Sequence, residues 1–263
     1  MSVTEIGAIA AQPVDRRRFC AVVPAAGAGS RLGSDEPKVL YPLLGRPIAI
    51  WLIDALDAVC DTLVFVLSPS GAPLVEPVLR ERLGDRLRVV VQHTPTGMGD
   101  AVLLAEEAAE ADHTIVVWGD QATLSQRTLR AVASRHESAG AALTLPIVRK
   151  ADPYIHFVRD ESGAIVGVQQ KREGEITVDV GDNDCGLFFF RTDALFGDLR
   201  RARAAREGMG ATTTEFNLVQ LIPNWDRPPF SIETVLLADP DETLGVNTPQ
   251  DAAAVEAILR SRA

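Results

Sequence analysis

The sequence predicts an α/β fold, a Rossmann-like mixed and mostly parallel sheet that is flanked by helices. Two observations support this class. Short apolar runs alternate with segments of helical periodicity through the first half of the 263-residue chain, and a glycine-rich loop follows the first apolar run. Strands joined by intervening helices favour parallel pairing with right-handed crossovers. The length suits one domain, which we place over residues 18–263 after a flexible N-terminal arm at residues 1–17.

Residues 19–38, FCAVVPAAGAGSRLGSDEPK, form the most informative stretch of the chain. An apolar strand is predicted over residues 19–23, and it leads into a loop of small residues. Glycines let the backbone approach a ligand closely, so a loop of this kind can bind phosphate groups. Arg31 and Lys38 add two cations nearby. We interpret the stretch as a phosphate-binding loop, and the alternative is a tight surface turn with two solvated charges.

Two better-known glycine motifs do not match this loop. The dinucleotide-binding fingerprint requires G-x-G-x-x-G, whereas Gly27, Gly29 and Gly33 read G-x-G-x-x-x-G. A P-loop requires Gly-Lys followed by Ser or Thr, whereas Lys38 lies between Pro37 and Val39. Both motifs are therefore disfavoured.

The remaining elements of the first half continue the alternation. Apolar residues at helical spacing predict a helix over residues 47–59, and a continuous apolar run at residues 63–67 predicts a strand that is buried on both faces. After a further helix, residues 88–92 form the third strand. A helix at residues 99–110 and a strand at residues 114–118 follow. In such sheets, ligands bind beyond the carboxyl ends of the strands.

The second half changes character and predicts a small β insertion. Two predicted strands over residues 156–170 surround a turn at residues 160–163, and we interpret this insertion as a lid or a substrate-facing hairpin. The other predicted elements are strands at residues 141–148, 187–190 and 233–237, a short helix at residues 214–221, and a terminal helix that begins at the cap Thr248-Pro249-Gln250-Asp251 and ends near Arg260.

Composition excludes several classes of partner. The net charge is −10 and the pI is about 4.9, which argues against a nucleic-acid or anionic-membrane surface. No apolar run approaches the roughly 18 residues that a membrane span needs. Cys20, Cys60 and Cys185 lack metal-ligand spacing, so we expect them to be reduced and buried. These features predict a cytoplasmic protein that binds neither nucleic acid nor membrane.

Two oxygen-bearing residues are candidate metal ligands. Asp120 follows the predicted strand at residues 114–118 through Gly119, which places a carboxylate at the end of a strand, where a magnesium ligand belongs. The alternative is that Asp120 caps the next helix, although Ser125 could do so instead. Asn247 would supply a second, neutral oxygen, and its alternative is an ordinary turn residue.

Three further features are weaker candidates. Gly97 and Gly99, in the turn at residues 96–101, could let the backbone approach a base or a ribose, or could simply give a helix start the room it needs. Lys171 could meet a substrate phosphate, and the alternative is an exposed lysine. The four histidines are scattered without a ligand pattern or a nucleophile partner, which argues against a metal hydrolase or a catalytic triad.

With these motifs in place, the chain resembles the sugar-1-phosphate nucleotidyltransferases, most closely the uridyltransferase domain of bacterial N-acetylglucosamine-1-phosphate uridyltransferases. The similarity covers roughly residues 19–260 and is carried by VVPAAGAGSRL, Pro37-Lys38, TGMGDA, WGD, VGVQQK and LGVNTPQD. The resemblance implies the nucleotide-diphospho-sugar transferase fold. It also implies a Mg²⁺-dependent reaction in which a sugar phosphate attacks the α-phosphorus of a nucleoside triphosphate (NTP) and releases pyrophosphate.

The resemblance assigns roles to particular residues. Arg31 and Lys38 would be catalytic, and Asp120 and Asn247 would hold Mg²⁺. The implied substrate contacts are Ala25, Ala26, Gly27, Gly29, Ser30, Gln92, Thr96, Gly97, Gly119, Gln169, Lys171 and Gly186. The partners would be an NTP and a phosphorylated small molecule, and a homo-oligomer is compatible with the sequence.

The chain also departs from this family where the family reads its substrates. Pro95 replaces a base-reading glutamine, Ile155 replaces a glycine beside the sugar, Gln169 replaces a sugar-contacting glutamate, and Asp184-Cys185 replaces Asn-Thr. The acetyltransferase domain of the relatives does not appear. We therefore expect a stand-alone enzyme that acts on a different phosphorylated sugar or a sugar-like cyclitol. The rival hypotheses are a cytidylyltransferase for a polyol phosphate or phosphonate, and a regulatory domain that binds nucleotide without turnover.

Overall fold

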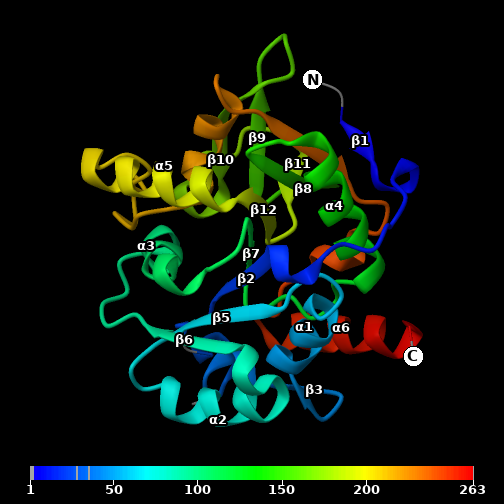
Figure 1. Cartoon of the computed structure of the whole chain (residues 1–263), viewed down its shortest axis with the longest axis vertical. Coiled ribbons are helices and arrows are strands. Elements are labelled where there is room, and N and C mark those ends of the chain that lie inside the picture. The colour runs from blue at the N-terminus through cyan, green and yellow to red at the C-terminus, as the bar shows by residue number, and fades with distance from the viewer. Residues whose placement is uncertain (1–2, 28, 35, 263) are drawn as a thin grey trace.

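The central feature of the computed structural model is a nine-stranded mixed sheet (Figure 1). The structure describes residues 3–27, 29–34 and 36–262, without the side chain of Ser30. In pairing order the strands are β1 (Thr4–Glu5), β13 (Ile232–Leu236), β8 (Leu143–Ala151), β12 (Leu187–Arg191), β7 (His113–Val117), β2 (Phe19–Pro24), β5 (Thr62–Leu67) and β6 (Leu87–Val91), with β11 (Val180–Asp184) beside β8. Strands β12 and β11 pair antiparallel with their neighbours and the other pairs are parallel, which confirms the predicted fold class.

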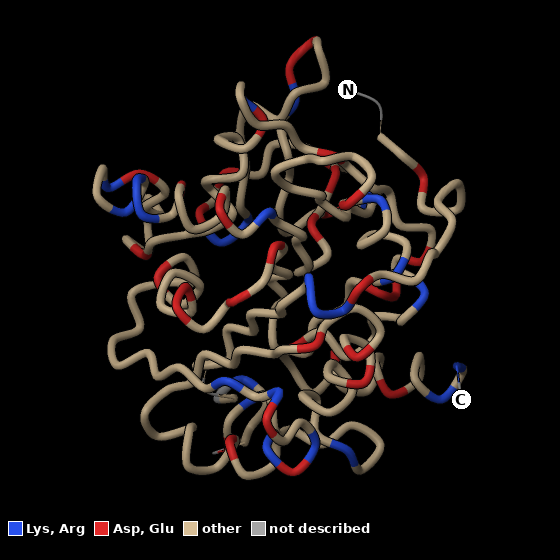
Figure 2. Tube along the Cα trace, viewed as in Figure 1, with Lys and Arg blue, Asp and Glu red and all other residues tan. Residues whose placement is uncertain are grey.

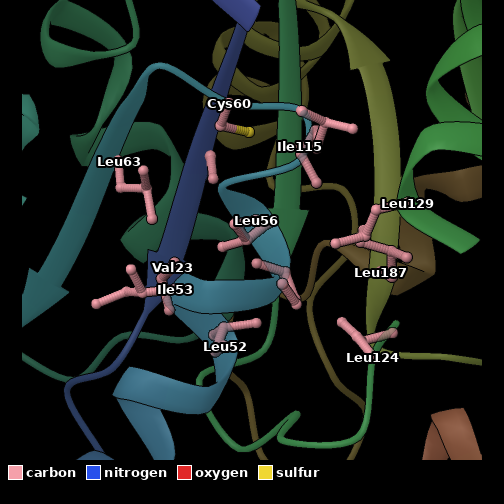
Figure 3. Close-up of a cluster of buried hydrophobic side chains, with 14 of the residues drawn as sticks. Val23, Leu52, Ile53, Leu56, Cys60, Leu63, Ile115, Leu124, Leu129 and Leu187 are labelled. Carbon is pink, nitrogen blue, oxygen red and sulfur yellow. The ribbon is translucent and has the colours of Figure 1, made fainter. Parts of the chain in front are cut away.

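Helices cover both faces of the sheet because the strand side chains alternate between two apolar layers. The helices are α1 (Ile48–Leu56), α2 (Ala72–Leu83), α3 (Met98–Leu104), α4 (Gln126–Ala139), α5 (Thr192–Ala205) and α6 (Pro249–Arg262). Phe189 packs in the layer with α1, α2 and α4, whereas Phe188 and Phe190 pack in the layer with α3 and α5. In Figure 3, Leu52 and Ile53 of α1 lie beside Val23 of β2 in the first layer.

The terminal helix has its own small core and the predicted cap. Val255 and Leu259 of α6 pack with Ile48 of α1, and Figure 1 shows the two helices side by side. The backbone N–H of Asp251 donates to Thr248 Oγ1 at 3.2 Å, and the N–H of Thr248 donates to Asp251 Oδ2 at 2.8 Å. This reciprocal pair is a capping box, and it fixes where the chain turns into α6.

The β insertion forms a separate two-stranded antiparallel sheet of β9 (Ile155–Arg159) and β10 (Ile165–Gln170), as predicted. Its turn is held by Asp160, whose Oδ1 accepts from the backbone N–H groups of Ser162 and Ala164. Strand β9 lies beside β11, which joins the hairpin to the main sheet.

Strand β11 and helix α5 escaped prediction for different reasons. Strand β11 reads VGDND and has no apolar alternation, but its polar side chains are buried and hydrogen-bonded, so tertiary contacts stabilise it. Helix α5 does carry a periodic apolar face, with Leu195 and Leu199 buried, and this local signal was present in the sequence.

Two predicted helices differ from the structure. The helix predicted at residues 214–221 is wrong: a 3-10 helix, η8 (Val219–Asp226), follows an extended segment around Phe216. The N–H of Phe216 donates to Thr96 O and its carbonyl accepts from the N–H of Gly99, so this backbone is paired with a distant turn. Helix α3 is shorter than predicted, since it ends at Leu104 and a 3-10 turn, η6 (Glu106–Ala108), follows.

Part of the segment expected as an N-terminal arm belongs to the sheet. Strand β1 pairs in parallel with β13, with Thr4 opposite Val235, and Thr4 Oγ1 donates to Glu233 Oε1 at 2.8 Å. These contacts place the described start of the chain at the sheet edge.

The three cysteines are buried, as the sequence predicts. Cys20, Cys60 and Cys185 are buried and unpaired by disulfides, and burial raises the pKa of Cys20 to about 12. Acidic and basic positions are interspersed along the described chain (Figure 2). Within the described part of the molecule, every helix is too short or too polar to cross a bilayer.

Candidate functional site

The glycine loop leaves the sheet at the carboxyl end of β2. The N–H of Ala25 donates to Val66 O of the neighbouring β5 at 2.8 Å, which extends the sheet pairing just past the end of β2. Gly29 packs so closely against the returning chain that a Cβ there would lie 3.0 Å from Glu36 O. A larger residue would therefore displace the backbone that carries Lys38.

Four polar side chains from distant parts of the sequence meet beside this loop. Lys38 Nζ donates to Asp120 Oδ2 at 2.5 Å and to Asn247 Oδ1 at 2.9 Å, and Arg31 Nη2 donates to Asn247 Oδ1 at 3.2 Å. The side chains of Lys38 and Asp120 are 21% and 14% exposed, so this ion pair is largely shielded but open on one side. The structure thus brings together the predicted cations and the predicted metal ligands.

Backbone pairing positions Asn247 against Asp120. The N–H of Val246 donates to Asp120 O at 3.1 Å, and Gln121 forms an isolated antiparallel bridge with Gly245. The segment after β7 is thereby joined to the segment before α6, although more than 120 residues separate them in the sequence. The capping box of α6 then sets the direction of the chain just after Asn247.

Two cavities meet at this polar cluster. The smaller has a volume of about 240 Å³ and is lined by the glycine loop, with Ala25, Gly27 and Gly119 among its residues. The larger has a volume of about 490 Å³ and extends toward the β insertion. Both cavities are lined by Arg31, Met98, Trp118, Asp120 and Asn247. The cluster therefore lies where two bound molecules could touch.

Many polar and charged residues line the larger cavity, beside apolar ones. Its remaining lining residues are Gln121, Lys150, Tyr154, Ile155, Gln170, Arg172, Asn183, Asp184, Gly186, Asn217, Val219, Thr243, Leu244, Gly245 and Asp251. Most of them come from the ends of β8, β10 and β11, from the β9 hairpin, and from the segments around η8 and the start of α6. Gln121 follows β7, and Gly186 lies between β11 and β12. Among the predicted contacts, Gly186 lines this cavity.

Several predicted contacts lie elsewhere. Gln92 and Thr96 line a separate cavity of about 350 Å³ near α3 and α5, and Gln92 Nε2 donates to Gly97 O at 3.3 Å. Gly97 has φ of +119°, and a Cβ there would lie 2.4 Å from Phe216 O. The packing of residue 216 therefore requires a glycine at this position, as the helix-start alternative expects.

Two predicted contacts of the β insertion also lie outside the two cavities. Gln169 Nε2 donates to Thr177 Oγ1 at 3.1 Å, and exposed Lys171 pairs with Asp152 at 2.7 Å. Their sequence neighbours Gln170 and Arg172 line the larger cavity instead. Successive side chains along a strand point to opposite faces of the sheet, so neighbouring residues of β10 face different surroundings. Ala26 and Gly29 belong to the glycine loop without lining either cavity, and the Ser30 side chain lies outside the described part of the structure.

Asp184 is a buried acid in the wall of the larger cavity. Burial raises its pKa to about 6; the backbone N–H of Gly186, which donates to Oδ2 at 2.9 Å, lowers it, and the nearby Asp120 raises it. Asn183, its neighbour on β11, is used structurally: its Oδ1 accepts from the N–H groups of Tyr154 and Ile155 at 2.8 and 3.0 Å. This bond fixes the start of β9 against β11.

We expect Asp184→Asn to gain stability relative to the wild type as the pH rises. The folded-state pKa is about 6 and the ordinary value is 3.8. Between these pH values the carboxyl is ionised in the unfolded chain but keeps its proton in the native state. The free energy of unfolding of the wild type therefore falls by about 1.4 kcal/mol per pH unit as the pH rises. The variant has an amide, which does not ionise, so its stability does not show this fall. Both proteins are unfolded with urea in the presence of EDTA at pH 4 and at pH 7. The free energy of unfolding of the variant minus that of the wild type should increase by about 2–3 kcal/mol over this range. A difference that stays flat would show that Asp184 ionises normally.

The donor set of the cluster fits a divalent cation. Asp120 Oδ1 is buried and has no hydrogen-bond partner among the described residues, while Asp120 Oδ2 and Asn247 Oδ1 converge on the ammonium of Lys38. Among the described residues no group of three or more His, Cys, Asp or Glu side chains could hold a metal on its own. Mg²⁺ is usually bound by one or two carboxylates together with substrate phosphates, which agrees with two protein oxygens here.

Comparisons with known proteins place the chain in a sequence family. The model of the MobA-like NTP transferase domain matches residues 21–208. The chain is 31% identical over 247 residues to the bifunctional protein GlmU of an Exiguobacterium species, and the match covers 92% of this chain and 53% of that protein. The GlmU of Heliobacterium modesticaldum is also 31% identical, over 92% of this chain and 52% of that protein. The chain thus spans about half the length of these curated relatives.

Solved structures agree on the fold. HddC from Yersinia pseudotuberculosis superimposes with a TM-score of 0.65 at 15% identity, covering 92% of this chain and 99% of that chain. The 4-diphosphocytidyl-2C-methyl-D-erythritol synthase from Anaerococcus prevotii gives a TM-score of 0.64 at 13% identity, covering 94% and 100%. The sheet order described above is accordingly that of the nucleotide-diphospho-sugar transferase fold.

Proposed function

Because the chain belongs to the MobA-like NTP transferase domain family, we propose that it is a Mg²⁺-dependent nucleotidyltransferase for a sugar 1-phosphate or a sugar-like cyclitol phosphate. The products would be an NDP-sugar, or its cyclitol counterpart, and pyrophosphate. The observation that carries this proposal is that Arg31, Asp120 and Asn247 line both cavities. Lys38, which lines the smaller one, contacts Asp120 and Asn247. Two bound phosphates can react only where their binding sites meet, and positive charges there must offset their repulsion.

We assign one substrate to each cavity. The smaller cavity, with the glycine loop at its wall, would take the triphosphate, since small residues there leave room for phosphates beside Lys38. The larger cavity would take the acceptor, because its polar lining suits a hydroxylated molecule. Both phosphates would then meet at Arg31 and Lys38.

The chemistry requires no nucleophile from the protein. An anionic oxygen of the acceptor phosphate attacks the α-phosphorus, a new P–O bond forms, and the bond from the α-phosphorus to the β-phosphate oxygen breaks. Pyrophosphate leaves with the bonding electrons. Lys38 and Arg31 would hold the two reacting phosphates together and offset the charge that develops on the phosphoryl oxygens.

Asp120 and Asn247 would hold Mg²⁺, which when bound would supply charge neutralisation and alignment of the triphosphate. In the structure both residues give oxygens to the Lys38 ammonium. Asp120 Oδ1, which has no hydrogen-bond partner among the described residues, would be available to the ion, and the Lys38 ammonium would pair with phosphate.

Pyrophosphate release from a substrate panel tests the proposed function. ATP, CTP, GTP and UTP are combined with glucose 1-phosphate, N-acetylglucosamine 1-phosphate, myo-inositol 1-phosphate, ribitol 5-phosphate and 2-aminoethylphosphonate. We expect release with a sugar or cyclitol phosphate, its abolition by EDTA and its restoration by MgCl₂. Release only with CTP and ribitol phosphate or the phosphonate would identify the cytidylyltransferase alternative. Tight NTP binding without release from any acceptor would favour the regulatory alternative.

A further inference from the structure

Lysine is rare in this chain, and its three lysines lie at or beside the two cavities. Of the 26 basic residues, all are arginines except Lys38, Lys150 and Lys171. Lys38 lines the smaller cavity, Lys150 lines the larger one, and Lys171 lies just outside them, paired with Asp152 at 2.7 Å. A lysine ammonium is a compact charge on a flexible stem, and it binds anions such as phosphate as a point charge. Lys38 has a role in the proposed mechanism, whereas Lys150 has none so far.

Lys150 is an exposed cation without an ion pair. It lies near the end of β8, and its ammonium has neither a carboxylate nor a hydrogen-bond partner among the described residues. Its strand neighbour Arg149 differs, since it pairs with the buried carboxylate of Asp182 at 3.1 Å. Arg172, which also lines the larger cavity and not the smaller, pairs with Glu215 at 3.4 Å. In the described wall of the larger cavity, Lys150 is therefore a cation that is available to a ligand.

The strand register places Lys150 away from the point where the two cavities meet. Lys150 lies opposite Gly181 of β11, three residues before Asp184, the buried acid near Asp120. Three residues of a β-strand span about 10 Å, so the Lys150 backbone lies about that far along the strands from Asp184. Lys150 also does not line the smaller cavity, unlike Arg31. Its ammonium thus lies in the part of the acceptor cavity that is distant from the reacting phosphates.

We propose that Lys150 binds a second anionic group of the acceptor, a carboxylate or a phosphate, while the reacting phosphate lies at Arg31 and Lys38. The acceptor would then be a sugar or cyclitol phosphate that carries a further acidic group. Because the whole chain has a net charge of −10, a doubly anionic ligand needs a local cation for each of its charges. This inference rests on the proposed function, since it treats the larger cavity as the acceptor site.

Two matched variants isolate the charge of Lys150. Lys150→Met removes the ammonium from an exposed side chain that makes no contact needed for folding. Lys171→Met makes the same change at the lysine that lies outside both cavities. Because exposed charges contribute little to stability, the unfolding midpoints of both variants should stay close to that of the wild type.

Titration calorimetry without nucleotide or metal measures the binding of matched ligands. Glucose 1-phosphate is compared with glucuronic acid 1-phosphate and glucose 1,6-bisphosphate, and myo-inositol 1-phosphate is compared with myo-inositol 1,4-bisphosphate. We expect the wild type and Lys171→Met to bind at least one doubly anionic ligand roughly 10-fold more tightly than its singly phosphorylated counterpart. Lys150→Met should lose this preference, and added NaCl should reduce it in the wild type.

The pattern of losses separates the alternatives. A preference for the carboxylate alone, or for the bisphosphates alone, that Lys150→Met abolishes would identify the anion that Lys150 takes. Equal weakening of singly and doubly anionic ligands in Lys150→Met would place Lys150 at the reacting phosphate and overturn the inference. So would a wild type without a preference, a preference that survives in Lys150→Met, or one that only Lys171→Met abolishes. Because the readout is binding, it is separate from the pyrophosphate assay that judges the proposed function.

Discussion

Replacing Lys38 with methionine is expected to lower kcat/KM for pyrophosphate release by about 10²–10³-fold. Methionine keeps much of the side-chain length but removes the ammonium that contacts Asp120 and Asn247 and would align the reacting phosphates. The measurement is steady-state pyrophosphate release with the NTP and acceptor pair that the wild type uses. Arg80→Met is the matched control, because it removes a surface ion pair with Glu76 far from the cavities.

The same substitution should change metal binding in the opposite direction. Asp120 and Asn247 give oxygens to Lys38 that a divalent cation would also use, so removing the ammonium removes a competitor. We expect Lys38→Met to bind Mn²⁺ more tightly than the wild type in the absence of nucleotide, as followed by electron paramagnetic resonance of the free ion. Unchanged Mn²⁺ affinity together with near-normal turnover would remove both Lys38 and the cluster from the proposed mechanism.

Asp120→Asn is expected to lower kcat/KM by at least about 10³-fold, because it deletes the carboxylate of the proposed metal site. The amide is nearly isosteric, but it leaves the Lys38 ammonium without its counter-charge and weakens the hold on a hard cation. The measurement combines pyrophosphate release over a range of MgCl₂ concentrations with a Mn²⁺ titration in the presence of NTP. Activity should remain low even at high MgCl₂, and the Mn²⁺ affinity should fall.

The control for this variant is Asp85→Asn, an exposed aspartate in the 3-10 turn η5 (Gly84–Arg86) before β6. It makes the same change of charge with no contact to either cavity. Unfolding midpoints of both variants show whether any loss reflects folding. Wild-type Mn²⁺ affinity and turnover in Asp120→Asn would require the metal to be held elsewhere.

The fold was predictable where the signal is local. Apolar runs such as residues 63–67 and 114–118 are buried on both sides of the sheet, and the cap at Thr248 starts α6 where expected. Strand β11 was not predictable in this way, because its burial depends on partners supplied by distant residues, such as Arg159 for Asp182. The segment around Phe216 likewise takes its conformation from the turn at residues 96–99.

Some features of the candidate site were also predictable from local sequence patterns, and others were not. Glycine spacing and the position of Asp120 after a strand were readable as sequence patterns, and the structure brings Arg31, Lys38, Asp120 and Asn247 into contact. In β10 the predicted contact Gln169 donates to Thr177, whereas its neighbour Gln170 lines the larger cavity. A two-residue side-chain period leaves both registers open until a neighbouring surface is known.

By itself, the sequence determined the alternation of strands and helices in the first half, the glycine spacing of the loop at residues 19–38 and the position of Asp120 just after a strand. Each of these depends on interactions between residues close in the chain, namely backbone propensity, apolar periodicity and capping. Only the tertiary structure decided that Lys38 lies between Asp120 and Asn247, and that Arg31 also donates to Asn247. Hydrogen-bond geometry between segments far apart in sequence sets these details, because it depends on where the folded backbone places each partner.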